Sequence, residues 1–385
     1  MRISNMPIRH LVAGVGAMVM GAVMTPSARA TDLTASSWFP PNHSVSLYLY
    51  DYYAKQAETY SNGTLKVISD TGSTTVSPRG AMEAVADGLA AISVHAGAYT
   101  PSALPLTSSL EELAMVYADA SVPVMVAAIA DFNMNDPVMQ AEWVKNGVVY
   151  GGSFVTNGYK LACTSPAVTL ADLKGKRVRM TTRSTAAWAK EMGMLSVAMS
   201  SNEQYSALDK GALDCTAALF ADVYQRKLYE VVSNGTDMPL AIFWAGFAWA
   251  YNPGVWASLT VDERRALFNA QGDALARFTY RGMIGDEASA YKTLPENGVT
   301  ITKPAPELVA ATEAFRTRLK AEAVEVAKDT FRVDDAQSLF DRFNATVAKW
   351  QARIEEAGVK DEESFAKLMR EEVYGKVDLA SYGVK

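Results

Sequence analysis

The residues best suited to bind an organic anion lie in the segment 170–180, which contains Asp172, Gly175, Arg177 and Arg179. The run from Asp172 to Gly175 is typical of a turn that leads into a short strand, and Arg179 falls at the carboxyl end of that strand. A guanidinium directed from there into a crevice can hold a carboxylate through two parallel charge-assisted hydrogen bonds. We interpret Arg177, at the start of the strand, as a solvated surface charge.

Residues that carry catalysis or bind metals are scarce. The chain has 3 His and 2 Cys, which argues against a zinc site and against a Cys/His catalytic centre. It contains no G-x-S-x-G, H-E-x-x-H or P-loop motif. We therefore predict a protein that is not an enzyme and that needs no cofactor, and no residue stands out as a metal ligand. An exported hydrolase is kept as an alternative, because a catalytic carboxylate pair among the 42 acidic residues has no diagnostic spacing.

Two histidines lie beyond residue 30. His95 ends a predicted strand, and open α/β sheets bind ligands at the carboxyl ends of their strands. His95 is therefore a candidate ligand contact, with a purely structural role as the alternative. His43 stands at a predicted helix start, and we expect it to cap that helix or to lie at the surface.

The net charge of the chain argues against two classes of binding partner. A net charge of −6, from 36 Lys and Arg against 42 Asp and Glu, argues against nucleic acid and against an anionic membrane surface, since each needs a basic face. With 385 residues, of which 49% are hydrophobic, the chain has enough material for a large core in two domains or one.

Residues 1–30 have the pattern of a Sec-type signal peptide. Arg2 and Arg9 precede the apolar run 11–24, and Ala28 to Ala30 matches an A-x-A cleavage site. The apolar run is short for a bilayer span, which argues against an uncleaved anchor. We expect cleavage after Ala30 and a periplasmic mature protein.

Two stretches of the chain repeat one order of elements, in which a strand is followed by a helix, a glycine and a second strand. The stretches comprise 65–68, 77–87, Gly88 and 89–95, and then 177–180, 201–210, Gly211 and 212–217. A polar residue at the helix start and a glycine just past its end are the usual boundary signals. The repeated order predicts two α/β lobes of related topology.

Beyond residue 255 the pattern becomes helical. Thr260 and Glu263 form a predicted capping box. Further amphipathic helices are predicted from Pro306, over 335–356 and over 361–373. We expect these helices to pack across both lobes.

The chain resembles the solute-binding proteins of the tripartite ATP-independent periplasmic (TRAP) transporters, of the C4-dicarboxylate-binding type. The landmarks are 38–43, 77–79, 84–88, 99–101, 157–160, 172–179 and 205–214. The resemblance implies a bilobal α/β periplasmic-binding-protein architecture with a hinge. It divides the chain into lobe I (31–153), lobe II (154–240), a return to lobe I (241–282) and helical segments that span and complete lobe II (283–385).

The resemblance also implies a function. The protein would bind a small organic carboxylate, with Arg179 fixing the carboxylate group, and would deliver it to a small and a large membrane subunit. An ABC-type or sensor-linked binding protein is a second alternative.

The pocket residues implied by the resemblance depart from the pattern of many family members. Lys160 stands where many have an arginine, and Ala218 stands where many have an asparagine that contacts the ligand. Aromatic residues fall in the segments placed at the cleft, namely Trp38, Phe39, Phe243 and Trp244. Because aromatic side chains favour an apolar or aromatic ligand, we expect an aromatic or otherwise hydrophobic monocarboxylate. A C4-dicarboxylate is the alternative.

Cys163 and Cys215 lie on predicted strands of the same lobe. Two cysteines in an exported protein are consistent with a disulfide. The alternative is a pair of small buried apolar residues on neighbouring strands.

Overall fold

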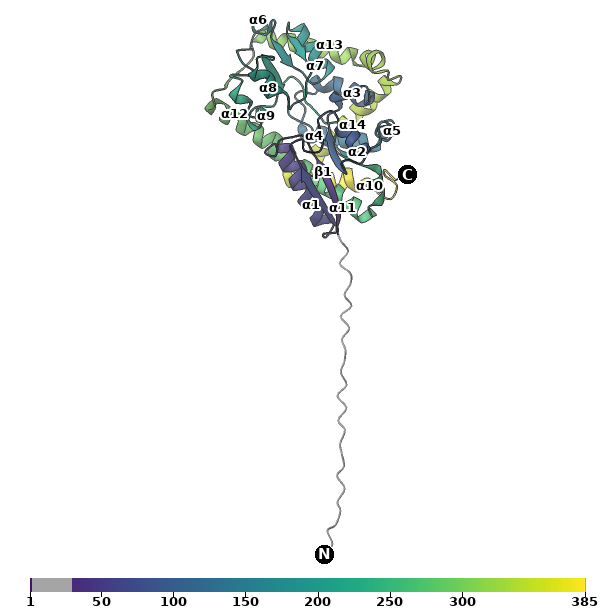
Figure 1. The fold of residues 1–385 in the computed structure, drawn as a ribbon. Coiled ribbons are helices and arrows are strands. Elements are labelled where there is room, and N and C mark those ends of the chain that lie inside the picture. The colour runs from purple at the N-terminus through teal and green to yellow at the C-terminus, as the bar shows by residue number, and fades with distance from the viewer. Residues whose placement is uncertain (2–29, 385) are drawn as a thin grey trace.

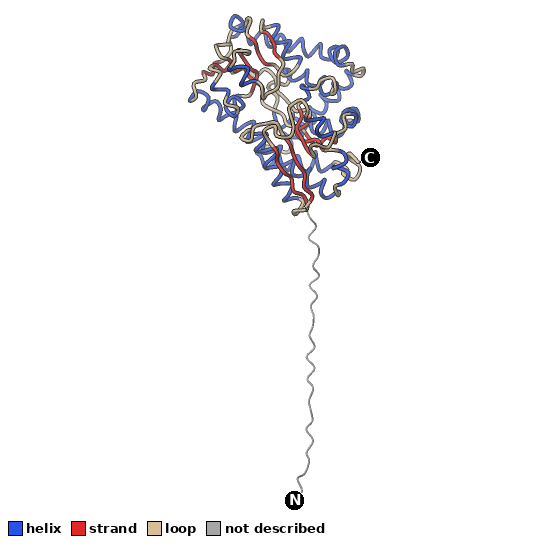
Figure 2. Tube along the Cα trace, viewed as in Figure 1, coloured by secondary structure: helices blue, strands red, loops and turns tan. Residues whose placement is uncertain are grey.

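The computed structural model describes residue 1 and residues 30–384. Most of the predicted signal peptide falls on residues 2–29, outside the described part, so cleavage after Ala30 stays a prediction. Figure 1 shows a two-lobed α/β protein, and Figure 2 shows that each lobe has its own set of strands. In the described part, no helix is both long and apolar enough to cross a membrane.

Lobe I is built on five strands, β1 (Thr31–Ser36), β2 (Leu65–Asp70), β3 (Ile92–His95), β4 (Val149–Gly152) and β10 (Phe247–Tyr251). Their order is β2-β1-β3-β10-β4, with β1, β2 and β3 parallel and β10 antiparallel to both of its neighbours. Every residue of β10 is buried, as expected for an inner strand of a sheet covered on both faces.

The helices of lobe I cover this sheet. They are α1 (Tyr52–Tyr60), α2 (Ala81–Ala86), α3 (Pro105–Glu111), α4 (Val122–Asn135), α5 (Pro137–Lys145), α10 (Pro253–Ser258) and α11 (Val261–Arg277). The predicted capping box begins α11, because the Thr260 hydroxyl accepts from the Glu263 N–H while the Glu263 carboxylate accepts from the Thr260 N–H.

Lobe II is built on six strands, β5 (Lys160–Cys163), β6 (Arg177–Arg179), β7 (Leu195–Val197), β8 (Cys215–Ala218), β9 (Asn234–Thr236) and β11 (Thr300–Thr302). Their order is β11-β9-β5-β8-β6-β7. The helices of the lobe are α6 (Leu170–Leu173), α7 (Arg183–Glu191), α8 (Gln204–Asp209), α9 (Phe220–Gln225) and α12 (Glu287–Glu296). On the antiparallel strands β5 and β8, Cys163 lies opposite Cys215, and the two form a disulfide.

Three further helices follow, α13 (Pro306–Phe331), α14 (Ala336–Glu356) and α15 (Glu362–Leu368). Helix α13 packs against α3 of lobe I and α7 of lobe II, so it spans both lobes as expected (Figure 1). Helices α14 and α15 instead pack against α4 and α11. The expectation that these helices pack across both lobes therefore suits α13 but not α14 and α15, which pack on helices of lobe I.

Short helical turns complete the chain. Those of π type are Val45–Asp51, Phe278–Asp286 and Met369–Val373, and those of 3₁₀ type are Gly97–Tyr99, Glu112–Met115, Leu228–Glu230 and Tyr374–Lys376. The first π turn follows β1 and the first 3₁₀ turn follows β3, so both lie at the carboxyl ends of lobe I strands. These are the ends at which an open α/β sheet binds its ligands.

Candidate ligand-binding site

Aromatic side chains gather where the strand ends of lobe I meet lobe II. Trp38 and Phe39 follow β1, and their rings stack with centroids 5.2 Å apart. Tyr99, from the turn after β3, lies 6.1 Å from Trp38, and Phe154 lies edge-on to Phe39 at 6.4 Å. Trp38 is 2% exposed and its indole nitrogen has no hydrogen-bond partner among the described residues. These rings form an apolar wall on the lobe I side.

Arg179 reaches this wall from lobe II. Its side chain leaves the carboxyl end of β6 and is almost completely buried. Its Nε donates to the Met199 carbonyl at 3.1 Å and one terminal nitrogen to the Ala217 carbonyl at 3.4 Å. The other terminal nitrogen lies 3.5 Å from the Tyr99 hydroxyl of lobe I. Carbonyl dipoles therefore orient the guanidinium, while no carboxylate of the described chain neutralises it within ion-pair distance.

Arg226 is a second cation at the same place. It follows directly on α9, and its guanidinium lies over the ring of Phe39, 5.1 Å from the centroid. Its Nε and one terminal nitrogen are shielded from solvent and have no hydrogen-bond acceptor in the part of the chain that the structure describes. Burial lowers the pKa of Arg226, although Asp222 opposes this shift. Buried guanidinium N–H groups without an acceptor are costly, so this side chain is suited to receive an anion.

Asp222 and His43 form a polar pair across the two lobes. The His43 Nε2 lies 2.7 Å from a carboxylate oxygen of Asp222 on α9, and the His43 ring lies 4.6 Å from the ring of Phe39. The His43 Nδ1 accepts a hydrogen bond from the Val45 N–H at 3.1 Å. Since Nδ1 is an acceptor, the imidazole is neutral and donates through Nε2. Burial, the largest influence, lowers the pKa of His43.

Other hydrogen bonds also join the lobes around these residues. They run from Asn42 Nδ2 to the Gln225 carbonyl (3.0 Å), from the Ser44 N–H to Gln225 Oε1 (3.1 Å), from the Ser201 N–H to the Tyr99 hydroxyl (3.0 Å) and from Asn202 Nδ2 to the Trp38 carbonyl (3.3 Å). The rings and the two guanidiniums are thus enclosed by contacts between the lobes.

Lys160, expected as the second cation of the site, has a different place. Its Nζ lies 2.8 Å from Glu287 of α12, and both side chains are 6% exposed. Glu287 also accepts from the N–H groups of Phe220 and Ala221 at the start of α9. Because Glu287 takes its charge, Lys160 acts on the cleft by fixing α9, which carries Asp222. Arg226, rather than Lys160, is the cation that lies beside Phe39 without an ion-pair partner among the described residues.

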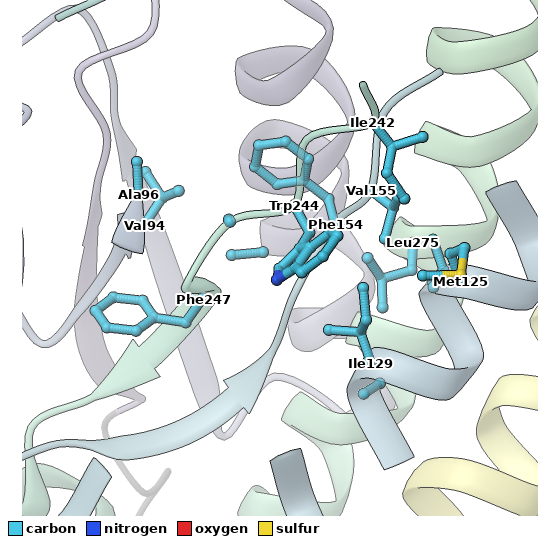
Figure 3. Packing of buried hydrophobic residues seen from close by; sticks show 14 of the residues in the cluster. Val94, Ala96, Met125, Ile129, Phe154, Val155, Ile242, Trp244, Phe247 and Leu275 are labelled. Carbon is cyan, nitrogen blue, oxygen red and sulfur yellow. The ribbon is translucent and has the colours of Figure 1, made fainter. Parts of the chain in front are cut away.

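The adjacent residues Phe243 and Trp244 face different surroundings. Phe243 is partly buried and stacks on Tyr159, with ring centroids 6.0 Å apart and an interplanar angle of 17°. Trp244 is 3% exposed and lies in the core, near Phe343 of α14. Figure 3 shows Trp244 within the packed cluster that contains Leu275. The pocket position expected for Phe243 stays a prediction, whereas Trp244 lies in the core, because consecutive extended residues point in opposite directions.

His95 and Ala218 are buried below the cleft. The His95 Nε2 lies 2.6 Å from the Thr100 hydroxyl, so His95 supports the turn that presents Tyr99. Burial lowers the pKa of His95 to about 4. Ala218 packs in the hydrophobic cluster of lobe II with Phe220. Both residues therefore pack inside the protein, and neither side chain lies among the aromatic rings and guanidiniums described above.

Arg226, Asp222 and the contact between His43 and Asp222 are not among the features predicted from the sequence. A signal for the first two was present, since Asp222 and Arg226 are four residues apart just after a strand that ends at the cleft. Helical spacing of four places two side chains on one face. No spacing signal links His43 to Asp222, because the contact spans 179 positions of the chain. No cluster of three metal-binding side chains occurs within residues 30–384.

Comparison with known proteins identifies the family to which the chain belongs. The model of the family described as bacterial extracellular solute-binding protein, family 7, matches residues 35–328. The C4-dicarboxylate-binding periplasmic protein DctP of Shewanella loihica is 25% identical over 192 residues, which are 49% of this chain and 54% of that protein. The match thus spans about half the length of this curated relative.

Solved structures share the fold. A marine metagenome TRAP solute-binding protein specific for aromatic acid ligands, solved with 3-hydroxybenzoate, has a TM-score of 0.73 at 20% identity, covering 83% of this chain and 99% of the other. A TRAP periplasmic solute-binding protein of Bordetella bronchiseptica, solved with (R)- and (S)-mandelate, has a TM-score of 0.69 at 22% identity, covering 83% and 99%. At these identities the likeness concerns the two-lobed fold, which confirms the predicted fold class.

Proposed function

The chain belongs to family 7 of the bacterial extracellular solute-binding proteins, those of TRAP transporters, and from this we propose that it binds a small aromatic or otherwise hydrophobic monocarboxylate between its lobes. It then delivers the ligand from the periplasm to the small and large membrane subunits of its transporter. Membership of this family sets aside the ABC-type alternative. It also favours a binding role over that of an exported hydrolase.

One observation carries the proposal. The guanidinium of Arg179, which is buried, and that of Arg226, which is partly buried, lie beside the aromatic side chains of Tyr99 and Phe39. Arg226 offers two nitrogens whose N–H groups lack an acceptor within the described chain, and a carboxylate is the acceptor that matches a guanidinium in charge and geometry. The rings supply a surface on which an apolar or aromatic ligand body loses its contact with water.

The same arrangement couples binding to closure. Phe39 and Tyr99 belong to lobe I, whereas Arg179 and Arg226 belong to lobe II. Bringing the lobes together buries the guanidiniums, which costs free energy unless a negative charge accompanies them. A carboxylate ligand therefore favours the closed state by its higher affinity for that state.

The relatives support the ligand class. One relative in the fold comparison is specific for aromatic acids and another was solved with mandelate, which is an aromatic monocarboxylate. The DctP relative binds C4-dicarboxylates, and a dicarboxylate is the second candidate for this chain. The stacked pair Phe243 and Tyr159 and the apolar wall of Trp38 and Phe39 favour the aromatic candidate.

Native mass spectrometry tests the proposal without assuming a ligand. Protein purified under non-denaturing conditions should carry an added mass that, after release, fragments as an organic acid. Protein that has been unfolded, dialysed and refolded should lose this mass and regain it on addition of the same acid. Recovery of an amine, a sugar or a peptide as the specifically retained compound would contradict the proposal.

A further inference from the structure

We propose that Asp222 makes the cleft selective for ligands with a single negative charge, by repelling the second carboxylate of a dicarboxylate. The proposal rests on the proposed function, since it assumes a carboxylate beside Arg179 and Arg226. It adds a specificity-determining residue that acts through charge, where the aromatic rings act through shape and apolar contact.

The charge of Asp222 is fixed by its partner. His43 is held as the neutral tautomer that donates through Nε2, because its Nδ1 accepts from the Val45 N–H. A donor facing Asp222 at 2.7 Å requires the carboxylate oxygen to accept. Burial acts to raise the pKa of Asp222, but His43, Arg226 and Arg179 outweigh it, and the pKa lies below its ordinary value. Asp222 is therefore a carboxylate whose charge no histidine cation cancels.

The charges of the two guanidiniums and of the carboxylate that acts on both of them sum to one positive charge. Arg179 and Arg226 contribute two, Asp222 removes one, and His43 contributes none. A monocarboxylate brings the sum to zero, which is the favourable state for a site shielded from water. A dicarboxylate leaves one uncompensated negative charge near Asp222, and like charges placed together in such a site are strongly unfavourable. Rejection of the wrong ligand by repulsion is a common route to specificity.

Other charged groups nearby have partners of their own. The partners of the two carboxylates are neutral hydrogen-bond donors, and that of Lys160 is an acid. The Asp286 carboxylate accepts from the Ser44 hydroxyl and from Gln225 Nε2. The Lys160 ammonium is paired with Glu287. The Glu203 carboxylate accepts from the N–H and hydroxyl of Ser200.

Arg79 lies at the rim over Tyr99, 5.8 Å from the ring centroid, and its charge opposes that of Glu203. Asp222 is the carboxylate whose charge acts on both Arg179 and Arg226. The charge of Glu203 is opposed by Arg79 and Arg179, and that of Asp286 acts on His43.

The variant Asp222→Asn isolates this charge. The amide oxygen of asparagine can still accept from His43 Nε2, so the contact between the lobes is preserved while the charge is removed. Asp286→Asn is the matched control, because it also replaces an acid that joins the lobes near His43 but is engaged by Ser44 and Gln225. Thermal unfolding of both variants without ligand reports whether each is folded.

Three probes hold the aromatic ring constant, namely benzoate, isophthalate and the monomethyl ester of isophthalate. The ester has nearly the size of isophthalate but one charge. We expect the wild-type protein to bind the ester at least about tenfold more tightly than isophthalate, since opposed like charges cost affinity. In Asp222→Asn this ratio should fall to near one, and in Asp286→Asn it should stay at the wild-type value.

The outcomes separate the two proposals. If wild-type protein binds benzoate but prefers isophthalate to its ester, the charge selection is wrong, and no variant is needed to show it. If the ratio in Asp222→Asn equals the wild-type ratio, Asp222 is not the residue responsible. If wild-type protein binds none of the three aromatic probes, the aromatic form of the proposed function fails instead.

Discussion

The guanidinium of Arg226 lies over the ring of Phe39, 5.1 Å from its centroid, so a cation of lobe II covers an aromatic residue of lobe I. A cation over an aromatic face is attracted by the ring quadrupole, and the attraction is larger when the pair is shielded from water. The contact holds the lobes together and places a cation at their junction. It therefore joins the two properties that a carboxylate-binding cleft needs, closure and positive charge.

Arg179→Ala should weaken binding of a benzoate-like acid by roughly 2–5 kcal/mol, the range for loss of one partner of a buried charge pair. Arg179→Lys should also weaken binding, because an ammonium cannot form two parallel hydrogen bonds with one carboxylate. Calorimetric titration measures both effects. Arg177→Gln is the control, since Arg177 is paired with Asp214 and its side chain is 41% exposed. Unchanged affinity in Arg179→Ala would remove this residue from the site.

Arg226→Gln should weaken binding of the same acid by a similar amount, because the guanidinium offers the N–H groups that lack an acceptor within residues 30–384. It should also reduce the free energy of closure, through loss of the contact with Phe39. Calorimetry measures the affinity, and small-angle scattering with and without ligand measures closure. Wild-type affinity in this variant would show that Arg226 serves only to hold the lobes together.

The disulfide between Cys163 and Cys215 predicts that no free thiol is found when the protein is denatured without reductant. After reduction the same assay should find 2 thiols, the full cysteine content of the chain. Reduction should lower the free energy of unfolding by roughly 2–4 kcal/mol, since the cross-link restricts the unfolded chain. Detection of both thiols before reduction would refute the bond.

Because His95 is buried in its neutral form, we expect the protein to lose stability on acidification. Burial lowers its pKa from 6.5 to about 4, so below pH 6.5 the unfolded chain binds a proton that the folded protein does not. The free energy of unfolding should therefore fall as the pH drops from 6.5 towards 4, by about 3 kcal/mol from this residue.

Urea denaturation of wild-type protein and His95→Gln across this range isolates the effect, because the carboxylates and His43 titrate in both. The glutamine variant should lose less stability on acidification. Parallel curves for the two proteins would show that His95 does not titrate in this way.

Much of the fold could be predicted from the sequence because its signals are local. The capping box of Thr260 and Glu263 depends on residues three apart, and it begins α11 as predicted. The strands and helices of the two repeated stretches have the glycine and polar boundary residues that short-range conformational preferences require. The lobe against which α14 packs could not be predicted, because its apolar face could be buried against helices of either lobe.

The site was harder to predict because residues that are far apart in the sequence come together in it. Arg179 was recognisable from its place at a strand end, and its neighbours in space come from 20 to 80 positions away. Phe243 and Trp244 are both aromatic, and the sequence does not show which way each side chain points. In the structure Phe243 stacks on Tyr159 and Trp244 packs in the core. Lys160 has the right charge for a ligand contact, but Glu287, 127 positions later, takes that charge.

The proposed ligand class is tested most directly by calorimetric titration of refolded, ligand-free wild-type protein with benzoate and, separately, with succinate. We expect saturable binding of benzoate at one site, tighter than any binding of succinate, with a negative heat-capacity change from burial of the ring against Phe39 and Phe243. Binding of succinate without binding of benzoate would contradict an aromatic monocarboxylate as the ligand.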